Sequence, residues 1–123
     1  AALLALRDGD FVLIHLEAAD ECGHDGLTDE KVKAIELLDS RVLAPLVSAL
    51  DGAGEPYRLI VMPDHSTPLC VRTHTPEPVP YLLYDSARAL SHNAPLYSEA
   101  AAAATGLLID DGTRLMPRFL GRT

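Results

Sequence analysis

The sequence predicts an α/β fold with a mostly parallel sheet flanked by helices, and three observations support this prediction. Two continuous apolar runs, residues 11–16 and 57–62, have the pattern of strands that are buried on both faces. The segment between them repeats apolar side chains at helical spacing. Strand, helix and strand in this order form the simplest parallel unit, and its crossover is expected to be right-handed.

The composition indicates one globular domain. The chain has 123 residues, of which 48% are hydrophobic and 23% are charged, so it has enough apolar material for a core. The formal net charge is -8, and the 10 basic residues are scattered, which weighs against a nucleic-acid-binding surface. No apolar run is long enough to span a membrane, and no leader-like segment begins the chain. We therefore expect a soluble, cytoplasmic protein.

The two cysteines and the first residues add two expectations. Cys22 and Cys70 are too few for a disulfide framework, so we expect free thiols in a reducing compartment. Cys22 lies between Asp20 and His24, but a small packing residue is a better interpretation than a metal ligand. Residues 1–7 have no initiator Met and resemble the end of a helix, so the chain is expected to be a fragment.

The first half of the chain is expected to form a strand, a polar loop and a long helix. The strand covers residues 11–16, and residues 17–26 form the loop. Thr28 is the predicted N-cap of the helix, and Pro45 should kink or split it. The expected apolar face consists of Val32, Ile35, Leu38, Val42, Leu46 and Ala49.

Glycines in residues 51–54 are expected to end this helix before the second strand. Residues 66–80 are rich in Thr and Pro and should form an irregular loop. A third strand is expected within residues 79–84. An alanine-rich helix over residues 98–104 should end at Gly106, and a last short helix is expected at residues 114–120.

Metal-ligand residue types follow each of the two main strands. Asp20 and His24 come after the first strand, and Asp64 and His65 come directly after the second. Ligands of parallel sheets gather at the carboxyl ends of the strands, so these pairs are expected to face one crevice, with His74 nearby. Carboxylate and imidazole ligands suit divalent cations. We expect Gly23 to turn the backbone between the first pair, and the side chains of the second pair to diverge.

Several other polar residues have plainer interpretations. His15 is expected to be a buried, hydrogen-bonded histidine of the first strand, and His92 a loop residue. Arg72 could reach a phosphate or carboxylate, although a solvated Arg is nearly as good an interpretation. Ser66 and Thr67 are expected to be turn residues, not nucleophiles.

Three motifs of this chain, taken in order, resemble a known family. The segments 20–26 (DECGHDG), 63–68 (PDHSTP) and 74–80 (HTPEPVP), together with the tail from Tyr97 to Met116, are similar to archaeal-type cofactor-independent phosphoglycerate mutases of the alkaline phosphatase superfamily. The resemblance covers the chain from about Asp10 onward. It implies that residues 1–123 are the C-terminal portion of an alkaline phosphatase-like metalloenzyme core.

The resemblance also implies a site with two divalent metal ions, Mn or Zn, with Mg as an alternative. Asp20, His24 and His74 would hold one ion, and Asp64 and His65 the other. The family's second ion also takes an Asp and a nucleophilic Ser from an N-terminal part that is not in this chain. The implied reaction transfers a phosphoryl group between the 3- and 2-positions of glycerate through a phosphoserine.

Two rival interpretations remain open at the level of sequence. The same ligands serve homoserine kinase-like proteins and relatives of phosphonopyruvate decarboxylases. A non-catalytic metal-binding module is the other rival, because the chain has no family nucleophile. The expected partners are a phosphorylated small molecule and the remainder of the parent polypeptide, with no nucleic acid and no membrane.

Overall fold

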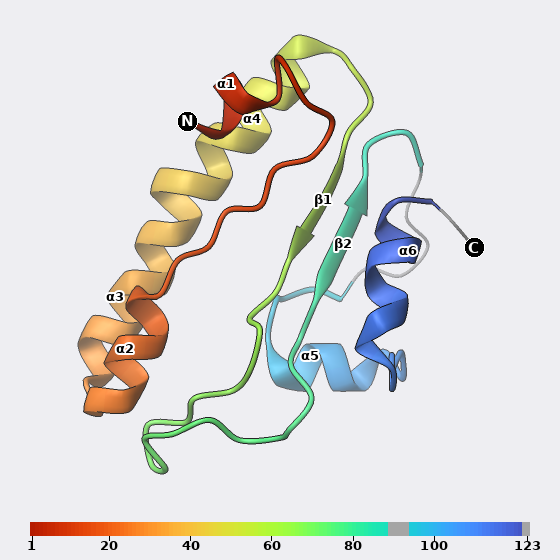
Figure 1. Cartoon of the computed structure of the whole chain (residues 1–123). Helices are drawn as coiled ribbons and strands as arrows, with labels where there is room; N and C mark the ends of the chain where they lie inside the picture. Colours follow the sequence, from red (N-terminus) through yellow and green to blue (C-terminus); the bar gives the residue numbers. More distant parts are fainter. Residues whose placement is uncertain (89–93, 122–123) are drawn as a thin grey trace. The chain divides into compact units, whose positions relative to one another are not determined.

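The computed structural model describes residues 1–88 and 94–121, which pack into two compact units (Figure 1). The first unit comprises Ala1–Gly54 and Thr67–Thr75. The second comprises Glu55–Ser66 and Pro76–Thr123. His92, which we expected in a loop, lies outside the described residues.

The first unit is built from helices. Its elements are α1 (Ala2–Ala5), α2 (Ala18–Asp25), α3 (Thr28–Leu38), a π-helical segment (Asp39–Leu43) and α4 (Ala44–Ala53). Helices α2 and α3 pack against each other. The long helix predicted between the two strands is therefore present, and the glycine that ends it is Gly54, in the left-handed conformation.

Helix α2 replaces the polar loop expected over residues 17–26. The segment begins with Ala18 and Ala19, which favour helix, and the left-handed Gly26 ends it with a φ of 73°. Gly23 does not turn the backbone as we expected, because it lies buried inside the helix. The prediction was wrong because clustered acids, Cys and Gly resemble a loop in composition, whereas the capping Gly26 determines the local structure.

The π-helical segment explains how the long helix accommodates Pro45. Proline has no N–H, so the carbonyl of Arg41 cannot receive the ordinary bond from a residue four positions later. The chain instead widens by one residue just before Pro45, and the Ala44 N–H bonds to the Asp39 carbonyl five residues earlier. The helix is neither split nor interrupted. Its N-cap is Leu27, not Thr28, and no side chain caps it.

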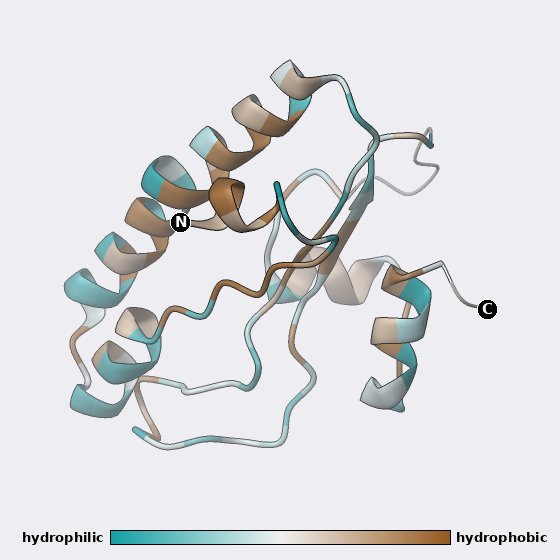
Figure 2. Cartoon of the chain, turned by 45° about the horizontal axis from the view of Figure 1, so that its top comes forward, coloured by the Kyte–Doolittle hydropathy of each residue, from teal (hydrophilic) through white to brown (hydrophobic). Residues whose placement is uncertain are grey.

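The apolar face of the long helix agrees with the predicted one at some positions and differs from it at others. Val32 and Ile35 are each 53% exposed, whereas Ala34 and Leu38 are half-buried. In α4, Leu46 is half-buried as expected, and Ala49 is exposed. Figure 2 shows hydrophobic residues along both helices.

The strand predicted at residues 11–16 is not formed. The segment is extended but is not a β-strand, and it runs beside the long helix within the first unit (Figures 1 and 2). Leu13 is 79% exposed, so the buried setting that we expected is absent. His15 is exposed as well, and its Nε2 lies 3.4 Å from Oε1 of Glu17. A strand needs a hydrogen-bonding neighbour, which sequence periodicity alone does not supply.

The second unit contains a two-stranded antiparallel sheet. Strand β1 (Arg58–Val61) pairs with β2 (Leu82–Asp85), with Arg58 opposite Asp85 and Val61 opposite Leu82. The predicted second and third strands are therefore present. The parallel pairing expected for the chain is not found among the described residues, because its other member, residues 11–16, does not form a strand.

Two polar side chains fasten this sheet to its surroundings. Arg58 donates from Nε to Asp85 Oδ2 at 2.9 Å and from Nη1 to the Phe119 carbonyl at 3.0 Å. The Tyr97 hydroxyl donates to the carbonyls of Val61 (3.2 Å) and Pro80 (3.1 Å). Burial raises the pKa of Tyr97, and the charge of nearby Glu99 adds to this shift.

Two further helices complete the second unit as the sequence predicted. Helix α5 (Glu99–Ala104) is capped by Ser98, whose Oγ accepts from the Ala101 N–H at 3.2 Å. A 3-10 turn (Gly112–Arg114) leads into α6 (Leu115–Phe119). None of the helices in the described ranges is long and apolar enough to span a membrane.

Candidate metal centre

Two of the predicted ligands lie on one face of α2. Asp20 and His24 are four residues apart, and residues at this spacing are neighbours on a helix surface. His24 Nε2 lies 3.4 Å from Asp20 Oδ2. The helix thus holds the two side chains next to each other, whereas the loop that we expected would not have fixed their relative positions.

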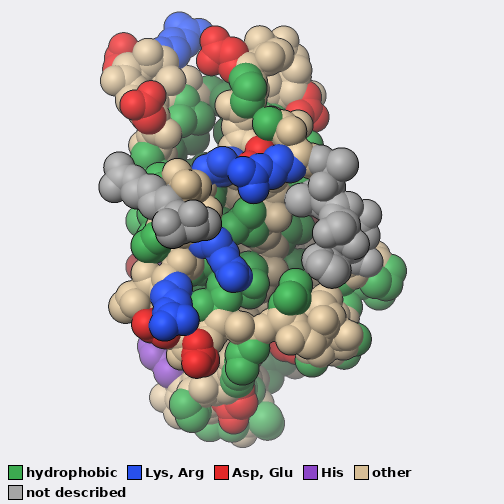
Figure 3. Space-filling view, turned by 90° about the vertical axis from the view of Figure 1, so that its right-hand side faces the viewer, with side chains coloured by type: hydrophobic (Ala, Val, Ile, Leu, Met, Phe, Trp, Pro, Cys, Tyr) green, Lys and Arg blue, Asp and Glu red, His purple; other side chains and the backbone are tan. Residues whose placement is uncertain are grey.

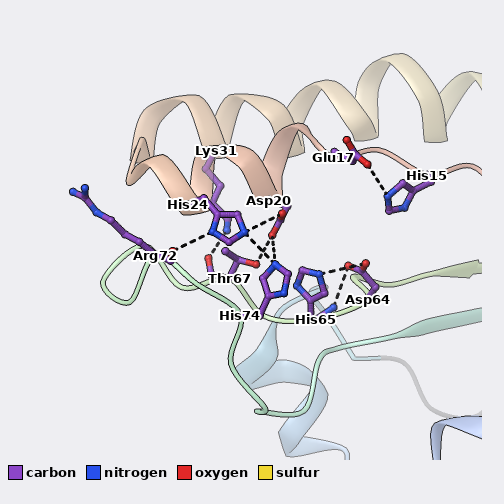
Figure 4. Close-up of polar contacts among 10 residues, drawn as sticks. All are labelled: His15, Glu17, Asp20, His24, Lys31, Asp64, His65, Thr67, Arg72 and His74. Carbon is purple, nitrogen blue, oxygen red and sulfur yellow. Dashed lines mark hydrogen bonds and ion pairs between the residues drawn. The ribbon is translucent and has the colours of Figure 1, made fainter.

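His74 brings a third ligand type to the same place from the loop of the first unit. Its Nε2 lies 3.1 Å from His24 Nε2 and 3.6 Å from Asp20 Oδ1 (Figure 4). Three side chains separated by up to 54 positions in sequence therefore converge on one point. We call Asp20, His24 and His74 the triad.

The donor atoms of the triad have the separations that ligands of one small cation have. Four ligands arranged tetrahedrally at zinc–nitrogen bond lengths of roughly 2.0–2.1 Å lie about 3.3 Å apart. Octahedral ligands at a similar bond length lie about 3.0 Å apart. The distances from His24 Nε2 to His74 Nε2 (3.1 Å) and to Asp20 Oδ2 (3.4 Å) agree with both arrangements, and the other carboxylate oxygen, Oδ1, lies 3.6 Å from His74 Nε2. One carboxylate and two imidazoles are also a donor set that suits Zn or Mn.

The backbone at Arg72 fixes which nitrogen of His24 is available. His24 Nδ1 donates to the Arg72 carbonyl at 3.1 Å. A neutral imidazole with its proton on Nδ1 keeps a lone pair on Nε2, which is the atom that faces Asp20 and His74. A hydrogen bond of this kind orients most metal-binding histidines.

Arg72 itself has an unusual conformation. Its φ is 57°, in the left-handed region, where a residue other than glycine is uncommon. Its side chain extends away from the triad (Figure 4). The guanidinium lies against Gly26, and a Cβ at position 26 would be only 2.6 Å from Arg72 Nε. Arg72 was predicted to contact substrate through its guanidinium, whereas the group that it brings to the triad is its carbonyl.

The second predicted pair, Asp64 and His65, lies in the second unit. The His65 N–H donates to Asp64 Oδ1 at 3.1 Å, and His65 Nε2 lies 3.4 Å from Asp64 Oδ2. The two side chains face one another instead of diverging as we expected. Their spacing fits two ligands of a single ion.

Sequence reasoning missed one residue that contacts Asp20 and two residues that contact that residue in turn. Thr67, expected to be a turn residue, is buried and its hydroxyl donates to Asp20 Oδ1. Lys31 Nζ donates to the Thr67 carbonyl at 2.7 Å. Gly23 packs directly against both. A glycine inside a helix is a sign of close packing, and it could have indicated this contact.

The basic side chains of the second unit are all arginines in the described residues: Arg58, Arg88, Arg114 and Arg118. Figure 3 looks onto the side that carries α6 and shows basic side chains among hydrophobic ones. Three of the four are paired with carboxylates, since Arg58 and Arg88 contact Asp85 and Arg114 contacts Asp111. Of these pairs, that of Arg58 with Asp85 is the shortest, at 2.9 Å, and Arg58 also bonds to the Phe119 carbonyl, so Arg58 has the clearest structural role.

The chain belongs to the Metalloenzyme superfamily, which it matches over residues 1–116. This match supports the alkaline phosphatase-like fold class and the use of divalent metal ions. No solved structure shows a significant match.

Proteins with similar sequences carry a more particular name. The chain is 43% identical, over 99% of its length, to a probable 2,3-bisphosphoglycerate-independent phosphoglycerate mutase of Geobacter sulfurreducens. It is 40% identical, over 80% of its length, to a 2,3-bisphosphoglycerate-independent phosphoglycerate mutase of Methanosarcina mazei. The chain spans 30% and 25% of these two proteins. The resemblance drawn from the three motifs is thus confirmed, and the chain corresponds to a minority of each relative's length.

Proposed function

We propose that the complete protein containing this chain is a metal-dependent phosphoglycerate mutase that interconverts 3-phosphoglycerate and 2-phosphoglycerate. The convergence of Asp20, His24 and His74 is the observation that carries this proposal. The similarity to proteins named as phosphoglycerate mutases supports the substrate class.

The triad would hold one divalent ion, and Asp64 with His65 would contribute to a second. The two ions together would neutralise phosphate oxygens and lower the pKa of an attacking hydroxyl. Mn and Zn fit the mixed donor set best, and Mg is the alternative. The remaining ligands of the second ion and the nucleophilic Ser are proposed to come from outside this chain.

This chain's own residues would act by holding their donor atoms in place. The Arg72 carbonyl keeps the His24 proton on Nδ1, so Nε2 presents its lone pair to the ion. Asp20 would supply the one negative charge of this donor set, and the two histidines would bind the ion through their neutral imidazoles. A role for the Arg72 side chain in binding substrate phosphate stays a prediction.

We also propose that residues 11–16 form a strand of a mostly parallel sheet in the complete protein. The support is the apolar character of this segment together with the exposure of its side chains, with Leu13 at 79% and Leu16 at 47%. A continuous apolar run of this kind is typical of a strand that is covered on both faces of a larger sheet.

A coupled enolase assay tests the proposed activity. The complete polypeptide, freed of metal and then supplied with Mn²⁺ or Zn²⁺, should convert 3-phosphoglycerate to 2-phosphoglycerate. Absence of turnover with either ion, together with turnover of another phosphorylated substrate such as phosphohomoserine, would replace the mutase assignment with another phosphotransferase of the superfamily. Metal binding without any turnover would favour the non-catalytic module.

A further inference from the structure

We propose that Thr67 is a positioning residue that holds the Asp20 carboxylate in the orientation needed to bind a metal ion, and that Lys31 and Gly23 hold Thr67 in place. The inference rests on the proposed function, because it concerns the same ion. It adds three residues that are not among the predicted ligands.

The contact between Thr67 and Asp20 is directional. The Thr67 hydroxyl donates to Asp20 Oδ1. The other oxygen, Oδ2, lies 3.4 Å from His24 Nε2, and Oδ1 itself lies 3.6 Å from His74 Nε2. A carboxylate that accepts a hydrogen bond on one oxygen resists rotation about its Cβ–Cγ bond, so each oxygen keeps its place beside one of the two imidazoles. Partners that hold a metal ligand in this way commonly matter nearly as much as the ligand itself.

Thr67 is held firmly enough to serve this purpose. It is only 6% exposed, so its hydroxyl has little access to competing water. Its carbonyl accepts from Lys31 Nζ at 2.7 Å, and this charge-assisted bond ties the loop to α3. Two contacts from two different helices thus fix one residue of an otherwise irregular loop.

Gly23 makes the approach of Thr67 to α2 feasible. A Cβ at this position would lie 2.7 Å from Lys31 Nζ, 2.8 Å from the Thr67 carbonyl oxygen and 2.9 Å from Thr67 Cγ2. Gly23 lies one residue before His24 and three after Asp20. A side chain here would therefore push Thr67 away from the carboxylate that it orients.

Metal affinity of the complete polypeptide is the direct test. Calorimetric titration with Mn²⁺ should show that Thr67→Val lowers the affinity of one site by roughly 10–100-fold. Thr67→Ser keeps the hydroxyl and should restore most of the affinity. Thr105→Val makes the same chemical change in the second unit, and it should leave Mn²⁺ affinity unaltered. Circular dichroism and melting temperature verify that each variant folds, and Thr67→Ala replaces the valine variant if that one does not.

Two further readouts separate positioning from general stability. The Co²⁺ absorption spectrum should change in Thr67→Val and stay as in wild type in Thr67→Ser. In an Asp20→Asn background, Thr67→Val should cause little additional loss of affinity, because the hydroxyl acts through Asp20. Gly23→Ala should reproduce the loss seen with Thr67→Val.

The outcomes distinguish this inference from the proposed function. Wild-type protein that binds no divalent ion would overturn the proposed function itself. Wild-type protein that binds the ion while Thr67→Val binds it equally well, or while Ser and Val variants lose affinity equally, would overturn only the role of Thr67.

Discussion

The two ring nitrogens of His24 have different partners, and this makes His24 the most informative single residue of the site. Nδ1 donates to a backbone carbonyl, and Nε2 faces Asp20 and His74. Sequence reasoning chose His24 for its spacing from Asp20. It could not foresee the Arg72 carbonyl, because a backbone contact between residues 48 positions apart leaves no trace in residue types.

Substitution of His24 should remove one metal site. In the complete polypeptide, His24→Ala should weaken Mn²⁺ binding at one site by more than the roughly 10–100-fold expected when only a supporting partner of a ligand is lost. Calorimetric titration measures this. His15→Ala is the matched control, since His15 is exposed and pairs with Glu17. Equal affinity in the His24 variant and wild type would contradict the ligand assignment.

Asp85 gives the second unit a dependence on acid pH. The hydrogen bond from Arg58, followed by that from the Ala87 N–H, holds the pKa of Asp85 below its usual value of 3.8. Because the folded pKa is lowered, the stabilisation is present above the unfolded pKa and is lost as pH falls through the folded one. Urea unfolding between pH 6 and pH 2 should show this loss in wild type and a smaller one in Asp85→Asn. Glu55→Gln, which removes an exposed acid of the same unit, should behave like wild type.

At the scale of elements, the boundaries of two helices were predictable from local chemistry, whereas α2, which Gly26 ends, was not predicted. Ser98 before the alanines and Gly54 after α4 mark helix boundaries by local chemistry, and the structure agrees at both. Pro45 predicted that the helix would be irregular, but not that the irregularity would be a π-helical segment. A proline shows which helical hydrogen bond is lost. Tertiary packing then determines whether the helix responds with a kink, a break or an inserted residue.

The N-cap of α5 provides a test at this scale. Ser98→Ala removes the acceptor of the Ala101 N–H and should lower the free energy of unfolding by about 1 kcal/mol. Ser48→Ala replaces an exposed serine inside α4, and it should be neutral or stabilising by a few tenths of a kcal/mol. Chemical denaturation of both variants measures the difference. A smaller loss for Ser98→Ala than for Ser48→Ala would show that the cap does not support α5.

At the scale of the whole chain, no aliphatic or aromatic side chain among the described residues is fully buried, so the chain by itself has no closed hydrophobic core. The sequence has ample apolar material, and composition alone therefore predicted a core. Composition does not show whether the residues that cover an apolar face belong to the same stretch of chain. This chain spans 30% or less of the two relatives described above. The strand at residues 11–16 and the parallel sheet are not formed in the described residues for the same reason, because both require neighbouring strands.

The isolated 123-residue chain should therefore be marginally stable and should depend on metal. We expect it to bind one divalent ion through the triad and to show no mutase activity. A site saturated at 100 times its dissociation constant adds about 2.7 kcal/mol to the free energy of unfolding. Thermal unfolding with and without Zn²⁺ measures this shift, and Asp20→Asn should reduce it. A melting temperature that is unaffected by metal in wild type would contradict the expectation.

The packing of Arg72 against Gly26 has a consequence for which residues position 26 accepts. Gly26 is constrained by its backbone, with a φ of 73°. The guanidinium of Arg72 also lies where a side chain at position 26 would point, but Arg72 is exposed and its flexible end can move away. Asn is the residue that best tolerates this backbone conformation, so position 26 should accept Asn more readily than residues such as Val or Ile, with Arg72 unchanged.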